Sequence, residues 1–246
     1  MNIFWAVFLG IVQGLTEFIP VSSSGHLVLF QNLIPGFNQP GILFDVILHL
    51  ATLTAVFYFF RKTLMMISKK YILLLGVGTI PAALAGYFFH KQFVALFGSI
   101  NALGIEFLIT GLLNMLVDSA KTVKKTISLP DSFAIGIAQA IAIIPGISRS
   151  GATIFTGVKL GIDREKVAEF SFLLSIPAIL GANILQLIDY QSDAIIHPSY
   201  YLVGFMSALI TGYLSIGVVY KFIRERKFRL FGVYCILLGF LTIIVL

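Results

Sequence analysis

Long apolar stretches of the chain are separated by short polar stretches, most of them rich in lysine and arginine. Six apolar stretches contain close to the roughly 20 residues that a helix needs to cross a bilayer. They cover residues 41–60, 71–89, 99–117, 167–188, 199–220 and 230–246. The pattern therefore predicts an all-α integral membrane protein with six transmembrane helices.

Two further apolar stretches, residues 2–35 and 130–158, are each broken in the middle by proline, serine and glycine. If each crossed the membrane once, the basic segments that follow residue 117 and precede residue 167 would lie on opposite sides. A hairpin that enters and leaves on one side avoids this, and non-helical backbone is tolerated at that depth where protein or a wet cavity surrounds it. We therefore expect two re-entrant helical hairpins. Two amphipathic helices on the lipid surface are the alternative, but they would leave Glu17 and Arg149 without partners.

Composition and charge also indicate a membrane protein. With 58% apolar and 11% charged residues, the chain has too few polar side chains to cover the surface of a soluble domain. The net charge of +6 would suit a nucleic-acid-binding protein, but every lysine and arginine except Lys91 and Arg149 falls on one side of the predicted spans. The positive-inside rule places that side in the cytoplasm and both termini outside. We expect no nucleic-acid partner.

The two broken segments are near-copies of each other in their glutamine, serine and glycine residues. A shift of 126 positions superposes Gln13 on Gln139, Ser22 on Ser148, Ser24 on Ser150 and Gly25 on Gly151. Within a single membrane domain of residues 1–246, residues 1–120 and 127–246 would form two repeats, each with one hairpin and three spans. Because three is odd, the repeats are inverted, and their broken tips meet near the midplane, where inverted repeats place substrate sites.

The first tip combines oxygen donors with a run of serines. Gln13 and Glu17 are four residues apart and share one helix face, and their oxygen atoms suit Mg²⁺ or Ca²⁺. Beyond Pro20, the start of a new helix offers free N–H groups to an anion, next to Ser22, Ser23, Ser24 and Gly25. Either Ser23 or His26 could attack phosphorus, and this choice stays open. The alternative for the serine run is a simple N-cap.

The second tip combines an intramembrane arginine with small residues. Arg149 suits bidentate phosphate contacts, although pairing with Glu17 alone would also explain it. The neighbouring candidates for anion binding are Gly146, Ser148, Ser150, Gly151 and Thr153. Asp45, His49, Glu106 and Glu169 are candidates to surround the site, with packing or loop capping as the favoured interpretation.

At these residues the chain resembles the bacterial undecaprenyl-diphosphatase family, also called bacitracin-resistance phosphatases. One motif runs from Gln13 to Glu17 into a serine-rich Gly-His, and the other is Pro-Gly-x-Ser-Arg-Ser-Gly-x-Thr at 145–153. The resemblance implies a multi-pass enzyme of the bacterial cytoplasmic (inner) membrane that hydrolyses undecaprenyl diphosphate to undecaprenyl phosphate and inorganic phosphate. This reaction recycles the lipid carrier for peptidoglycan and other cell-wall polymers and confers bacitracin resistance, since bacitracin competes only indirectly, by sequestering the substrate.

The same resemblance implies roles for the candidate residues and a divalent cation as cofactor. Glu17 and Gln13 would hold the metal or position water, and Ser23 or His26 would attack. Arg149, with Ser148 and Thr153, would bind the diphosphate. The expected partners are this substrate and membrane lipid, and the oligomeric state is left open, with a homodimer as one option.

Two other functions use similar residues. The type 2 phosphatidic acid phosphatase superfamily needs a second histidine soon after its Ser-Arg pair, but no histidine follows Ser148 and Arg149 until His197, so we reject it. A lipid-phosphate transporter, or flippase, is the more serious alternative, because inverted repeats with broken helices are typical of transporters. It would use the same anion site without a nucleophile.

Overall fold

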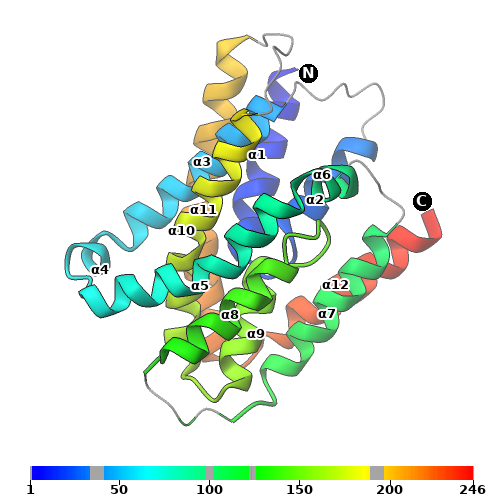
Figure 1. Ribbon diagram of the computed structural model, residues 1–246. Coiled ribbons are helices and arrows are strands. Elements are labelled where there is room, and N and C mark those ends of the chain that lie inside the picture. Colours follow the sequence, from blue (N-terminus) through cyan, green and yellow to red (C-terminus); the bar gives the residue numbers. More distant parts are fainter. Residues whose placement is uncertain are drawn as a thin grey trace.

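The computed structural model describes residues 2–33, 42–97, 102–121, 123, 126–188 and 197–245, and the regular elements in these ranges are helices (Figure 1). The all-α prediction is therefore confirmed for this part of the chain. The helices are α1 Ile3–Phe18, α2 Ser23–Leu33, α3 Ile42–Phe59, α4 Arg61–Met65, α5 Lys69–Phe88, α6 His90–Phe97, α7 Leu103–Val117, α8 Leu129–Ile141, α9 Arg149–Lys159, α10 Arg164–Ile188, α11 Pro198–Arg224 and α12 Arg229–Val245.

Each predicted span falls on one helix, in the order α3, α5, α7, α10, α11 and α12. Three of these helices, α5, α10 and α11, are long and apolar enough to cross a membrane, whereas α3, α7 and α12 are shorter apolar helices. The structure thus supports a membrane protein, and the arrangement of six crossings with two re-entrant hairpins stays a prediction.

Both predicted hairpins are broken where the sequence places proline, serine and glycine. In the first, α1 ends before Pro20, which restricts Ile19 to an extended conformation (φ −59°, ψ 131°). Ser22 then adopts a left-handed conformation (φ 69°), and its hydroxyl accepts a 3.3 Å bond from the Gly25 N–H at the start of α2. In the second, the Ser148 hydroxyl caps α9 in the same way, by a 3.1 Å bond from the Gly151 N–H.

The first helix of each broken segment packs against a helix from the other half of the chain. Helix α1 lies along α11, and α8 lies along α5 (Figure 1). A Cβ atom at Gly10 would collide with the Gly204 carbonyl, and one at Gly136 would collide with the Gly78 carbonyl. The same 126-residue shift that relates the two tips carries Gly10 onto Gly136 and Gly78 onto Gly204, so the two close crossings are equivalent.

The remaining long helices enclose the two breaks. Helices α7 and α12 run side by side as an antiparallel pair (Figure 1), and α10 packs against α3, α5 and α9. The main hydrophobic cluster lies beneath the first break, where the fully buried ring of Phe18 meets Phe172 edge-on, with 5.6 Å between ring centroids. This packing joins the end of α1 and one face of α9 to α10.

Candidate active site

The carboxylate of Glu17 joins the two breaks. It lies in the last turn of α1 and is buried. One of its oxygens, Oε1, accepts a 2.8 Å bond from Nη2 of Arg149. The other, Oε2, accepts a 3.0 Å bond from the Gln13 amide and a 2.7 Å bond from the Ser23 hydroxyl. A buried carboxylate needs such compensation because burial removes its water.

Serine hydroxyls make a second, direct junction between the breaks. Ser22 and Ser24 both donate to the carbonyl oxygen of Pro145. Ser23 lies between them and turns the other way, toward Glu17. The structure thus brings candidate residues from both halves of the chain into contact.

His26 has partners on both ring nitrogens, and Ser23 is neither of them. Its Nδ1 lies 2.7 Å from the Ser22 carbonyl oxygen, and its Nε2 lies 2.7 Å from the Tyr234 hydroxyl. Because a carbonyl can only accept, we assign the proton to Nδ1, so that Nε2 accepts from Tyr234. The Tyr234 ring also stacks on the imidazole at 8°. The sequence analysis missed this tyrosine.

Arg149 begins α9, and within the described part of the chain its guanidinium makes two hydrogen bonds. Its Nη1 donates to the Ser171 carbonyl at 3.2 Å, and its Nη2 donates to Glu17. These bonds use two of the five N–H donors of a guanidinium. The first N–H groups of α2 and α9 also have no carbonyl partner within their own helices, so each break carries backbone donors of the kind that bind anions.

The other candidates of the second tip differ in what they contact. The Ser148 and Ser150 hydroxyls lie 3.3 Å apart, as the Ser22 and Ser24 hydroxyls do at 3.4 Å. The buried Thr153 hydroxyl instead lies 2.6 Å from the Ser171 hydroxyl and bonds to carbonyls of its own helix. Thr153 therefore braces α9 against α10, and its role in binding diphosphate stays a prediction.

The small residues of the tips allow close packing around these groups. Gly25 packs against Phe107 of α7, and a Cβ at Gly146 would collide with the Glu106 side chain. Gly151 lies against Asn114 of α7 and against Ser148. Residues of α7 therefore contact both tips.

Three polar residues on one face of α7 contact the backbone of the breaks. Glu106 Oε2 accepts from the Gly146 N–H at 3.1 Å, Thr110 bonds to the second break, and the Asn114 amide donates to the Pro20 carbonyl. The sequence analysis favoured packing or capping for Glu106 and missed Thr110 and Asn114. Their i, i+4, i+8 spacing within a predicted span was the available signal.

The donor set for a divalent cation is small. Gln13 Oε1 is buried and has no hydrogen-bond partner in the described structure, so it is available to a cation. Glu17 is the adjacent carboxylate. Among the described residues, no group of three or more His, Cys, Asp or Glu side chains could hold a metal. A cation here would therefore take its remaining ligands from water and substrate, as Mg²⁺ commonly does.

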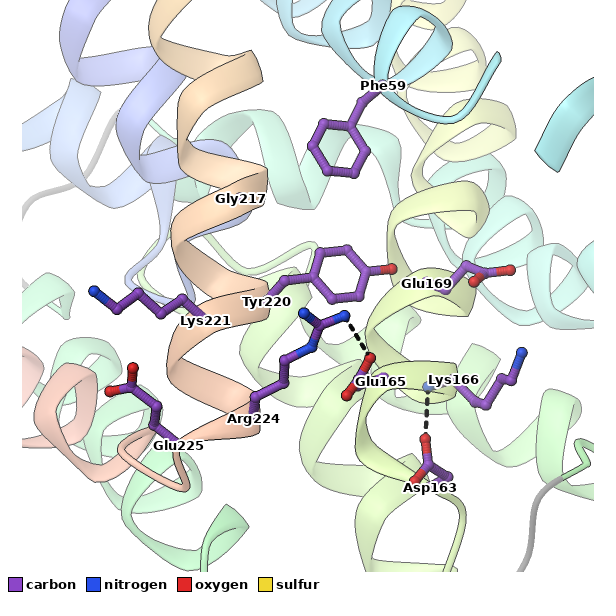
Figure 2. Close-up of a pocket in the computed structure, with 10 residues that line it drawn as sticks. All are labelled: Phe59, Asp163, Glu165, Lys166, Glu169, Gly217, Tyr220, Lys221, Arg224 and Glu225. Carbon is purple, nitrogen blue, oxygen red and sulfur yellow. Dashed lines mark hydrogen bonds and ion pairs between the residues drawn. The ribbon is translucent and has the colours of Figure 1, made fainter. Parts of the chain in front are cut away.

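A cavity of about 900 Å³ lies elsewhere, between the cytoplasm-directed ends predicted for α10 and α11 (Figure 2). Tyr220 and Phe59 line it together with charged residues, including Glu169. An exposed ion pair, Arg224 with Glu165 at 2.9 Å, spans the two helices there. None of the candidate residues of the two tips lines this cavity.

Comparison with known proteins agrees with the two motifs. Residues 6–241 match the family described as bacitracin resistance protein BacA. An undecaprenyl-diphosphatase of Carboxydothermus hydrogenoformans is 44% identical, over 100% of this chain and 98% of that protein. Undecaprenyl-diphosphatase 4 of Bacillus cereus is 41% identical, over 99% and 97% of the two chains. An undecaprenyl-diphosphatase of Methanobrevibacter smithii is 37% identical, over 98% and 97%.

Proposed function

The chain belongs to the bacitracin resistance protein BacA family, and from this membership we propose that it hydrolyses undecaprenyl diphosphate to undecaprenyl phosphate and inorganic phosphate. The family predicted from the two motifs is confirmed. One observation carries the chemistry: the Ser23 hydroxyl lies 2.7 Å from a Glu17 oxygen, and the other oxygen of this carboxylate binds Arg149 at 2.8 Å.

In the proposed reaction, Ser23 Oγ attacks the terminal phosphorus of the substrate. The Oγ–P bond forms as the bridging P–O bond breaks, and the hydroxyl proton passes to Glu17 Oε2. Undecaprenyl phosphate leaves with the bridging oxygen. Water then attacks the phosphoserine, and its oxygen joins phosphorus as the Oγ–P bond breaks. Inorganic phosphate departs with the protons of that water, and the proton held on Glu17 Oε2 returns to Ser23 Oγ. We prefer Ser23 to His26 as the nucleophile because both imidazole nitrogens already have partners.

Arg149 and the helix N-termini would stabilise the charge that moves during this transfer. Phosphoryl transfer depends mainly on positioning and charge neutralisation. The guanidinium donors that remain free on Arg149 can bind non-bridging oxygens, while its bond to Glu17 keeps it next to the attacking hydroxyl. The N-termini of α2 and α9 converge on the same region through the contact of Ser22 with Pro145.

We further propose that Gln13 and Glu17 hold a divalent cation, Mg²⁺ or Ca²⁺, when substrate binds. The unpartnered Gln13 oxygen supports this assignment. The ion would neutralise part of the diphosphate charge. Glu17 would keep its bonds to Ser23 and Arg149 as it contributes to this site.

The topology proposed here is six crossings with two re-entrant hairpins in two inverted repeats, with both termini outside the cytoplasmic membrane. The equivalent crossings of α1 with α11 and of α8 with α5 support it. So does Figure 1, in which the start of α1 and the end of α12 both lie away from the basic α4. Membrane lipid would surround the apolar outer faces, and the homodimer option stays a prediction.

The proposed reaction would make the cell resistant to bacitracin, because it removes the undecaprenyl diphosphate that bacitracin sequesters.

Purified protein in detergent tests the proposed function against the transporter alternative. In detergent, a phosphatase releases inorganic phosphate from undecaprenyl diphosphate. A flippase cannot transport its substrate without a bilayer, and it leaves the phosphoanhydride bond of the substrate intact. We expect phosphate release that depends on a divalent cation. Intact substrate after long incubation would favour the transporter.

Arg149→Lys is expected to lower kcat/KM at least ten-fold. Lysine keeps the charge but loses the planar fork that lets one side chain hold Glu17, the Ser171 carbonyl and an anion together. A lost charge-assisted hydrogen bond is worth roughly 1.5 to 3 kcal/mol, which corresponds to about one to two decades. Expression and detergent stability should stay near the parent values. Turnover at the parent rate would make Arg149 a simple counter-ion to Glu17.

Two substitutions of His26 separate a positioning role from a chemical one. Asparagine can place an N–H donor near the position of Nδ1 and so keep the bond to the Ser22 carbonyl, whereas glutamine extends toward the position of Nε2. We expect His26→Asn to retain at least a tenth of parental kcat and His26→Gln to lose clearly more. If both variants are equally inactive while folded, the imidazole itself takes part in the reaction.

A further inference from the structure

Helix α7 binds both breaks through carbonyl groups that occupy equivalent positions in the two halves. Thr110 donates to the Gly146 carbonyl at 2.9 Å, and Asn114, one turn later, donates to the Pro20 carbonyl. The 126-residue shift superposes Pro20 on Gly146. Both α7 side chains are fully buried. One helix face therefore fixes the two breaks relative to each other.

The Thr110 hydroxyl makes two hydrogen bonds to the second break. Besides donating to Gly146, its oxygen accepts from the Ser148 N–H at 2.9 Å. The Gly146 N–H is held by Glu106 in the preceding turn of α7. These bonds fix the peptide groups on both sides of Ile147, immediately before Arg149 begins α9.

The direction of the Arg149 side chain depends on this stretch of backbone. Arg149 is the first residue of α9, so the orientation of the Ser148 peptide sets where its side chain starts. Its guanidinium must then reach both Glu17 and the Ser171 carbonyl. The buried Thr110 hydroxyl donates to the Gly146 carbonyl and accepts from the Ser148 N–H. It can therefore fix the backbone from which the Arg149 side chain extends.

We propose that Thr110 is a positioning residue for Arg149, acting through the Gly146 carbonyl and the Ser148 N–H. The proposal rests on the proposed function, because it assigns Thr110 a part in placing the group that binds the diphosphate. Asn114 performs the corresponding task at the first break, where it holds the Pro20 carbonyl ahead of Ser23. Thr110 itself does not touch the substrate.

Thr110→Val tests this directly, since valine has nearly the same shape but neither donates nor accepts. We expect kcat/KM for undecaprenyl diphosphate in detergent to fall at least ten-fold, with a rise in KM as well as a drop in kcat, because the anion-binding group is displaced. A purely structural role would reduce the fraction of active protein, which lowers kcat alone. Thr110→Ser, which restores the hydroxyl, should recover most of the loss.

The matched control is Thr242→Val on α12. Thr242 is also buried in the α7–α12 pair, but its hydroxyl donates to the Leu238 carbonyl of its own helix at 2.8 Å. Its replacement should leave kcat/KM within two-fold of the parent. Thermal unfolding in the same detergent reports on folding for every variant. If Thr110→Val does not yield folded protein, Thr110→Ala replaces it with the same expectations.

A double-mutant cycle tests whether the effect of Thr110 on activity depends on the Arg149 side chain. In the Arg149→Lys background, where the fork is already lost, Thr110→Val should cost less than three-fold instead of ten-fold. Full additivity would overturn the proposal, and so would parental kcat/KM in folded Thr110→Val when Arg149→Lys is impaired. A parent protein that releases no phosphate would instead refute the proposed function.

Discussion

Replacing Ser23 with alanine is expected to lower kcat for undecaprenyl diphosphate by about three decades or more, which is the largest loss from any single hydroxyl in the chain. Each decade corresponds to about 1.4 kcal/mol of barrier. The substitution removes the attacking atom but leaves Glu17, Arg149 and both helix N-termini in place, so substrate affinity should change little. Phosphate release in detergent at saturating substrate measures kcat.

Ser207→Ala is the matched control for this experiment. Ser207 on α11 is partly buried like Ser23, but in the described part of the structure its hydroxyl bonds to carbonyls of its own helix, those of Val203 and Gly204. Activity within two-fold of the parent is expected. If Ser23→Ala keeps more than a tenth of parental kcat, the Ser23 hydroxyl serves mainly as a hydrogen-bond donor to the buried Glu17 carboxylate, and water or another group attacks phosphorus.

Glu17→Gln should reduce turnover by two decades or more. Glutamine keeps the shape of the side chain, and its oxygen can still accept from Arg149. It cannot take the proton of Ser23, and the negative charge that would attract a cation is lost. Folding should survive. Near-normal turnover at saturating Mg²⁺ would reduce Glu17 to a structural role.

A second glutamate–arginine pair provides the control for Glu17. Glu165 bonds to Arg224 at 2.9 Å, but both side chains are largely exposed, with relative accessibilities of 45% and 62%. Exposed pairs contribute little, typically about 0 to 1 kcal/mol. Glu165→Gln should therefore leave turnover within two-fold of the parent, which separates loss of a reacting carboxylate from loss of any ion pair.

The residues that pair across the two tips could be predicted from the sequence. Charged and polar groups in an apolar chain must find partners or line a cavity, and pairing of Arg149 with Glu17 was the alternative that the sequence offered to phosphate binding by Arg149. Their 2.8 Å ion pair agrees with that expectation. The breaks near Pro20 and Ser148 could also be predicted, because proline and an N-capping serine act locally.

The supporting residues could not be predicted with the same methods. A threonine within an apolar helix usually bonds to its own helix, as Thr54 and Thr79 do here. The spacing of Thr110 with Glu106 and Asn114 therefore marks a shared polar face of α7, but it does not show that Thr110 bonds to the second break. Tyr234 lies 208 positions from His26, and an apolar pattern does not tell which aromatic ring will stack on a given histidine. Such contacts depend on tertiary packing.

Helix boundaries differed from the predicted spans where polar residues continue a helix. Helix α10 begins at Arg164, three residues before the predicted span, and the Asp163 carboxylate accepts from the Lys166 N–H at 3.2 Å in its first turn. Helix α11 extends to Arg224, beyond the predicted end at residue 220. Hydropathy marks the apolar part of a helix, whereas the helix itself ends where its hydrogen bonds end.

The stereochemistry at phosphorus tests the central claim, attack by Ser23, most directly. The terminal phosphorus of undecaprenyl diphosphate is made chiral with sulfur and oxygen isotopes, and the purified protein hydrolyses it in isotopically labelled water. Attack by Ser23 followed by water involves two in-line displacements, each of which inverts the centre, so the released thiophosphate should show overall retention. Inversion would mean a single displacement by water and would contradict a covalent phosphoserine at the junction of the two tips.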